Sequence, residues 1–78
     1  MKVLVRKQNS PVKRFYVDLT EEKIIEEMKS FISKCKYEKA IKVALSKGKV
    51  LREITQEEEY YLDAQLILTN SSVHYDLM

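Results

Sequence analysis

The sequence predicts a small α+β protein of one domain, residues 1–78, with two amphipathic helices packed on short antiparallel strands in the order β-β-α-α-β-β-β. Residues 12–19 alternate apolar and polar side chains, which is the period of a half-buried strand. Residues 20–35 instead carry apolar side chains at the spacing of one helix face. The 78 residues include one glycine and one proline, so we expect no linker and no second domain.

The first two elements are predicted strands over 2–8 and 12–19. Val3 and Val5 are β-branched, as strands favour, and the segment 9–11, Asn-Ser-Pro, has the composition of a turn. The two strands can therefore form a hairpin. The alternation in the second strand places Phe15, Val17 and Leu19 on one face and Arg14, Tyr16 and Asp18 on the other.

A helix is predicted over 20–35. Asp18 or Thr20 can act as its N-cap, since Asp18 and Glu21 have the spacing of a capping box. The apolar face of this helix contains Ile24, Ile25, Met28, Phe31, Ile32 and Cys35.

A second helix is predicted over 37–47, and Gly48 is placed to end it. Its apolar face contains Tyr37, Ala40, Ile41, Ala44 and Leu45. At about 100° per residue, this face is displaced from that of the first helix by roughly half a turn. The displacement predicts a bend near residues 34–36. A single helix that is buried on opposite sides at its two ends is the alternative.

Three further elements are predicted after the helices. Residues 49–54 favour a strand, residues 70–72 (Asn-Ser-Ser) favour a turn, and residues 73–77 alternate again as a short strand does.

The stretch between them is ambiguous. Thr55 and Glu58 have the spacing of a capping box at a helix start. Strict alternation follows, with apolar side chains at Tyr60, Leu62, Ala64, Leu66 and Leu68. This alternation favours a strand over 60–69 with Tyr60 buried, and both helix and strand stay open for 55–65.

One cysteine and one histidine limit how a chain of this length can be stabilised. Cys35 has no partner for an internal disulfide, and a structural zinc site usually needs four Cys or His ligands. Small domains without these aids often oligomerise, so we expect a homodimer.

No apolar run reaches the roughly 20 residues of a membrane span, and the first residues lack the features of a secretory signal. A lone thiol suits a reducing compartment, so we expect a cytoplasmic protein of the cell or of a host cell, with no membrane partner.

Charge is segregated along the chain, although the net charge is only +2. Residues 1–14 and 34–49 are rich in basic side chains, whereas residues 53–63 carry acidic side chains and no base. Such segregation can steer a polyanion toward one region and repel it from another. An ordinary solvated surface is the alternative explanation.

The sequence offers little catalytic chemistry. His74 and Asp76 share a face of a predicted strand, and the simplest interpretation is that this face is exposed to solvent. Cys35 falls on an apolar helix face, where free thiols are commonly buried. The consecutive carboxylates Glu57–Glu59 lack a calcium-type loop, and one glycine is too few for a phosphate-binding loop. We therefore predict that the protein is not an enzyme and has no cofactor, metal or small-molecule substrate.

Two motifs frame the predicted helices: Leu19-Thr20-Glu21-Glu22 opens the first, and Ile41-Lys42-Val43-Ala44-Leu45 closes the second. With the preceding strand, residues 14–45 resemble the ribbon-helix-helix family of DNA-binding transcription regulators. The resemblance implies a homodimer whose paired strands enter the DNA major groove. The residues that it implies at the DNA are Arg14, Tyr16, Lys34, Lys36 and Lys39. The chain departs from the family in the outward-facing Asp18, in the inter-helix turn without glycine, and in the extra strands on both sides.

Protein binding is the alternative function, for example by a small inhibitor or accessory protein that a virus or mobile element encodes. Its candidate contact residues are Glu57, Glu58, Glu59 and Tyr61, because acidic side chains and tyrosines gather there. The two functions differ in the pairing of residues 12–18. A DNA-binding ribbon pairs them with a second chain, whereas a single mixed sheet pairs them with residues 2–8.

Overall fold

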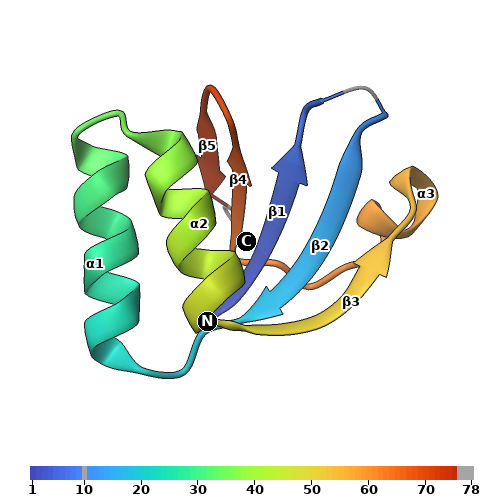
Figure 1. Cartoon of the computed structure of the whole chain (residues 1–78). Helices are drawn as coiled ribbons and strands as arrows, with labels where there is room; N and C mark the ends of the chain where they lie inside the picture. The colour runs from blue at the N-terminus through green and yellow to red at the C-terminus, as the bar shows by residue number, and fades with distance from the viewer. Residues whose placement is uncertain (10, 76–78) are drawn as a thin grey trace.

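The computed structural model describes residues 1–9 and 11–75, in which one mixed sheet has the strand order β3-β2-β1-β4-β5. The elements in chain order are β1 (Lys2–Lys7), β2 (Lys13–Asp18), α1 (Glu22–Ser33), α2 (Tyr37–Lys47), β3 (Lys49–Ile54), α3 (Gln56–Glu59), β4 (Leu66–Thr69) and β5 (Val73–Tyr75). On one face of the sheet α2 contacts β1, β3 and β4, and α1 packs against α2 (Figure 1). The predicted α+β class and element order are confirmed, with the short α3 added between β3 and β4.

β1 lies at the centre of the sheet. It pairs antiparallel with β2, with Val5 opposite Phe15, and parallel with β4, with Val3 beside Leu66. β3 and β5 extend the sheet beyond β2 and β4, both antiparallel. The predicted hairpin is confirmed. The parallel pairing was not expected, and it arises because the chain passes through both helices, β3 and α3 before it returns beside β1.

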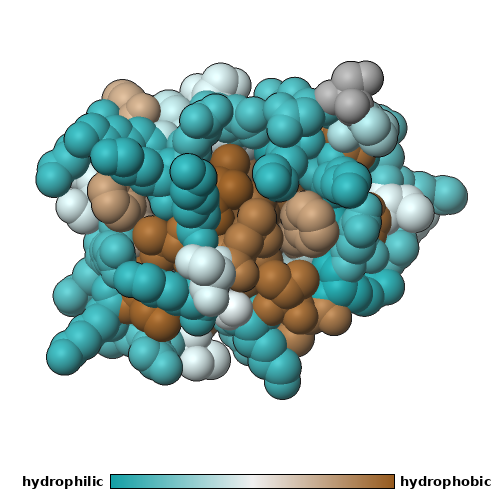
Figure 2. All heavy atoms as spheres, in the orientation of Figure 1, coloured by the Kyte–Doolittle hydropathy of each residue, from teal (hydrophilic) through white to brown (hydrophobic). Residues whose placement is uncertain are grey.

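The larger core lies between the sheet and the two long helices. The residues that build it from the sheet are Val3, Val5, Val17, Leu66 and Leu68, all fully buried. Met28, Ile41 and Ala44 close it from the helices. The predicted apolar face of the second strand is confirmed, since Val17 and Leu19 are buried and Phe15 packs against them. Figure 2 shows apolar side chains gathered in a band between the helices and the sheet, framed by polar ones.

β1 is also buried on its second face, which α1 and α2 do not cover. Leu4 is 1% exposed there and packs with Ile54 and Ala64. The segment that follows α3 supplies Ala64 and Leu62 to this smaller core. Burying one leucine contributes about 1.5–3 kcal/mol, so this contact holds the segment after α3 against the sheet.

The predicted capping of the first helix is wrong. α1 begins after Glu21, which forms no side-chain cap hydrogen bond. Asp18 is engaged elsewhere, because its carboxylate pairs with Lys2 Nζ at 3.2 Å and with the N-terminal amine of Met1 at 3.7 Å. The acid that was expected to cap the helix instead ties the end of β2 to the start of β1.

The bend predicted near residues 34–36 is confirmed, and Cys35 produces it. Cys35 has a left-handed backbone, φ 57°, and the Lys36 amide donates to the Phe31 carbonyl at 2.8 Å. This is the geometry that commonly ends a helix. The prediction that Cys35 belongs to the buried stripe is wrong, since its side chain is exposed. The left-handed residue leaves the helical path, so its side chain leaves the helix face.

The strand predicted over 60–69 is wrong for residues 60–65 and forms only over β4. Of the segment 55–65, for which helix and strand both stayed open, residues 56–59 are helical. Thr55 Oγ1 accepts from the Glu58 amide at 3.3 Å and caps α3. Tyr60 was expected to be buried and is 80% exposed. The alternation misleads because Leu62 and Ala64 reach Leu4 from an irregular segment, and backbone hydrogen bonding with β1 begins only at Gln65, whose amide donates to the Lys2 carbonyl at 2.9 Å.

The last predicted strand is confirmed as β5 over three residues. The rest of the predicted range 73–77 lies outside the described residues. The turn before it is held by Thr69, which is 1% exposed and whose Oγ1 accepts from the amides of Ser71 and Ser72.

Gly48 provides a test of the packing between α2 and β3. Its backbone is ordinary, with φ −81°, but an added Cβ would lie 2.5 Å from both the Ala44 carbonyl oxygen and Leu19 Cδ2. We expect Gly48→Ala to lower the free energy of unfolding by about 1–3 kcal/mol through overpacking, as measured by urea denaturation. Lys49→Ala, at an exposed neighbour, is the control and should change it by less than about 0.5 kcal/mol. A Gly48→Ala variant as stable as the control would contradict the close packing.

Candidate functional site

Two arginines face each other on the side of the sheet away from α1 and α2. Arg6 of β1 and Arg14 of β2 are directly opposite in the register, where like charges repel. Glu59, the last residue of α3, places its carboxylate between them. Its Oε1 accepts from Arg6 Nη2 at 2.5 Å, and its Oε2 accepts from Arg14 Nε. One carboxylate thus bridges both guanidinium groups and ties α3 to the hairpin.

Partial burial strengthens this cluster. The side chains of Arg6, Arg14 and Glu59 are 26%, 15% and 12% exposed. Burial by itself raises the pKa of Glu59, but the hydrogen bonds and charges of the two arginines outweigh it and hold the pKa below its ordinary value. Glu59 is therefore ionised at neutral pH. Two arginines with one glutamate leave the cluster with a net charge of +1.

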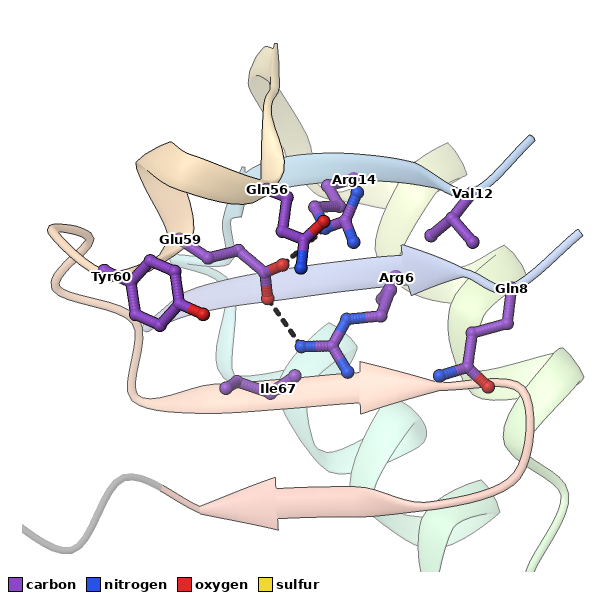
Figure 3. Close-up of a pocket in the computed structure, with 8 residues that line it drawn as sticks. All are labelled: Arg6, Gln8, Val12, Arg14, Gln56, Glu59, Tyr60 and Ile67. Carbon is purple, nitrogen blue, oxygen red and sulfur yellow. Dashed lines mark hydrogen bonds and ion pairs between the residues drawn. The ribbon is translucent and has the colours of Figure 1, made fainter. Parts of the chain in front are cut away.

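A pocket of about 530 Å³ opens beside the cluster. Its lining consists of Arg6, Gln8, Val12, Arg14, Gln56, Glu59, Tyr60 and Ile67. Figure 3 shows Tyr60 at one end of the pocket, Gln8 and Val12 at the other, and Arg6 between them. The volume lies within the range of about 300–1,000 Å³ that is typical of sites for small ligands.

Most guanidinium donors in this pocket have no partner among the described residues. Arg6 Nε is buried and makes no hydrogen bond to them. Arg6 bonds Glu59 through Nη2 alone, and Arg14 bonds it through Nε alone. Since a guanidinium carries five N–H donors, the two arginines can still donate to an acceptor that enters the pocket.

Two tyrosines follow α3 directly, and the first of them, Tyr60, lines the pocket. Tyr60 is 80% exposed and Tyr61 is 85% exposed, although both carry large apolar rings. The neighbouring Glu58 pairs with Arg52 of β3 at 2.6 Å, which adds a second, more exposed contact between α3 and the sheet. The tyrosines therefore project from a segment that is anchored at both Glu58 and Glu59.

The residues implied at DNA are not brought together. Arg14 and Tyr16 lie on the face away from the long helices, with Arg14 held by Glu59 and the Tyr16 hydroxyl donating to the Asp63 carbonyl at 3.2 Å. The remaining three, Lys34, Lys36 and Lys39, are exposed in the turn between α1 and α2 and at the start of α2. β2 pairs on both sides within its own chain, with β1 and with β3. In this sheet it has no free edge for a ribbon with a second chain, and the homodimer stays a prediction.

The four residues predicted to contact a protein partner fall into two pairs, one exposed and one engaged within the chain. Glu57 and Tyr61 are exposed, as such a role requires. Glu58 and Glu59 instead form ion pairs within the chain. Sequence reasoning named Arg14 and Glu59 of the pocket lining, each for another role, and missed Arg6 and the other lining residues. A signal was available, because a hairpin of the two predicted strands can place Arg6 opposite Arg14 on the same face as Leu4.

The other reactive residues lie outside the pocket. His74 is on β5, where its Nε2 is 3.4 Å from Ser72 Oγ, and Asp76 is outside the described residues. Cys35 is in the turn between the long helices. Within residues 1–9 and 11–75, no three His, Cys, Asp or Glu side chains are grouped closely enough to hold a metal ion. In the same part of the chain, no helix has both the length and the apolar character to cross a membrane.

Comparison of the chain with protein-family models, with curated proteins and with solved structures finds no match. The candidate site is therefore defined by the contacts and charges of its own residues.

Glu59 gives a pH-dependent test of the cluster. We expect Glu59→Gln to lower the free energy of unfolding at pH 7 by about 1–3 kcal/mol, because both arginines lose their charged acceptor. The folded-state pKa of Glu59 lies below its ordinary value of 4.5. The stabilisation is therefore present above pH 4.5 and is lost as the pH falls through the folded-state pKa. Urea denaturation from pH 7 to pH 3 should show the two proteins converge in acid.

Glu57→Gln is the matched control, since Glu57 is exposed and lies in the same helix. Its effect should stay within about 0.5 kcal/mol throughout. A Glu59→Gln effect that persists unchanged at pH 3 would contradict an ionic role for this carboxylate.

Proposed function

We propose that this chain is a non-enzymatic protein-binding module, such as a small inhibitor or accessory protein. It binds its partner through the α3 surface, which we define as Tyr60, Tyr61, Glu57 and the mouth of the two-arginine pocket. The observation that carries the proposal is the pair of neighbouring tyrosines, 80% and 85% exposed, of which Tyr60 lines that pocket.

The composition of the α3 surface supports a protein partner. Tyrosine and arginine are enriched in protein interfaces and often supply most of the binding energy. A tyrosine ring covers a large apolar area while its hydroxyl remains solvated. The ion pairs of Glu58 and Glu59 hold α3 in place, so less conformational entropy is lost when a partner binds.

The two tyrosines can be tested by affinity capture. We expect the wild-type chain, immobilised and exposed to an extract of the organism that encodes it, to enrich a specific protein. The double variant Tyr60→Ser, Tyr61→Ser should retain roughly tenfold less of that protein, as loss of aromatic anchors typically does. Its thermal stability should match that of the wild type, because both rings are largely exposed.

Tyr75→Ser is the control, since Tyr75 is 55% exposed on β5, outside the α3 surface. It should capture the protein as the wild type does. Equal capture by the double variant would rule out the α3 surface as the binding face.

A second candidate function is nucleic-acid binding through the basic turn, defined as Lys34, Lys36 and Lys39. All three side chains are exposed, and none forms an ion pair with another described residue. Exposed lysines without acidic partners favour contact with phosphates. With Arg14 held by Glu59 on the other side of the sheet, this surface is suited to backbone contact and not to reading bases.

Duplex binding at low salt tests this candidate. We expect a labelled duplex to bind at about 50 mM salt and to dissociate steeply as the salt rises. Lys36→Ala should weaken binding to all sequences alike and reduce the salt slope by about one. Lys23→Ala, which replaces an exposed lysine on α1, should leave the affinity and the salt slope unchanged. A chain that binds no duplex at that salt concentration has no such function.

A further inference from the structure

We infer that the two-arginine pocket is a binding site for a carboxylate side chain of the protein partner. This inference deepens the proposed function and rests on it for the molecule that carries the carboxylate. The pocket itself is built by residues of β1, β2, β4 and α3, together with Gln8, Val12 and Tyr60 next to these elements (Figure 3).

The first support is the set of donors that remains in the pocket. Each arginine bonds Glu59 through one nitrogen, Arg6 through Nη2 and Arg14 through Nε, so the terminal N–H groups that do not take part in these bonds have no partner among the described residues. A planar guanidinium presents paired N–H groups that match the two oxygens of a carboxylate. The amides of Gln8 and Gln56 also line the pocket and can donate to the same ligand.

The second support is the charge of the cluster. Arg6 and Arg14 with Glu59 carry a net charge of +1, so one entering carboxylate makes the site neutral. A phosphate dianion would leave the same site with a net charge of −1 and would lie near the ionised Glu59. Repulsion at short range in a partly buried site is costly, so the cluster favours a carboxylate over a phosphate.

The third support is the apolar part of the lining. Val12, Ile67 and the ring of Tyr60 line the pocket with the polar groups. These surfaces can pack against the methylene groups of an acidic side chain and against an apolar neighbour of it. A volume of about 530 Å³ has room for both. The ligand class is therefore a glutamate or aspartate that lies next to an apolar residue.

Capped dipeptides test this inference without the natural partner. The probe is a capped dipeptide of glutamate and leucine, and its counterpart has glutamine in place of glutamate. Binding is followed through the side-chain Nε–H resonances of the arginines in ¹⁵N-labelled protein. We expect saturable shifts with the glutamate probe and roughly tenfold weaker binding of the glutamine probe, because a charge-assisted contact is lost. Inorganic phosphate and benzoate are titrated in parallel.

Two variants and a control locate the site. Arg6→Gln removes a guanidinium, and Val12→Trp adds bulk at an exposed position of the lining without touching the ion pairs. Each should weaken binding of the glutamate probe roughly tenfold. Lys13→Gln is the control: it removes the same charge from an exposed position on β2 and should leave binding of the glutamate probe unchanged. If Arg6→Gln does not fold, Val12→Trp decides the location.

Four results overturn the inference: equal binding of both dipeptides, tighter binding of phosphate, tighter binding of benzoate than of the glutamate dipeptide, and binding that Val12→Trp leaves unchanged. The result of the dipeptide titrations can be distinguished from the result of the affinity capture that tests the proposed function. Loss of partner capture in the tyrosine double variant tests docking at the α3 surface, whereas the dipeptides report on the pocket alone.

Discussion

The burial of β1 on both faces is the constraint on which the rest of the structure depends. Val3 and Val5 point into the core under the helices, and Leu4 between them points the other way and is equally buried. A strand of this kind needs a layer on each side, although the chain has only two long helices, and both serve one side. The other layer is the irregular segment with α3 at its start. It covers Leu4 but does not extend over the whole face.

The binding pocket follows from this incomplete layer. Beyond Leu4, the same face of β1 continues with Arg6, opposite Arg14 and at the margin of the covering segment. Partial burial of two like charges is unfavourable, and Glu59 offsets it with one carboxylate. The bridge anchors α3 and leaves donors facing the open space. Stability and binding capacity thus have a common origin, since the ion pairs that hold the segment in place also orient the groups that a ligand would meet.

Periodicity predicted the elements whose pattern reflects their burial. The strand over 12–19 and the helix over 37–47 were found because each presents a single apolar face to the core. Residues 60–65 were assigned wrongly because Leu62 and Ala64 satisfy an alternating pattern without pairing in the sheet. The pocket was missed for another reason. Its central contact joins Glu59 to arginines that are 45 and 53 residues away in the sequence, and no local pattern encodes such a contact.

The parallel pairing of β1 with β4 also sets an order of events during synthesis. β1 leaves the ribosome before both helices and β3, yet Val3 meets Leu66 only after all of these elements have been made. Until then the hairpin, the helices and β3 can assemble, but one edge of β1 and its second face remain uncovered. Contacts of such long sequence separation slow folding, and an open strand edge can pair with other chains. A nascent chain of this protein therefore passes through a period in which it is vulnerable to aggregation, and β4 and the segment before it bring that period to an end.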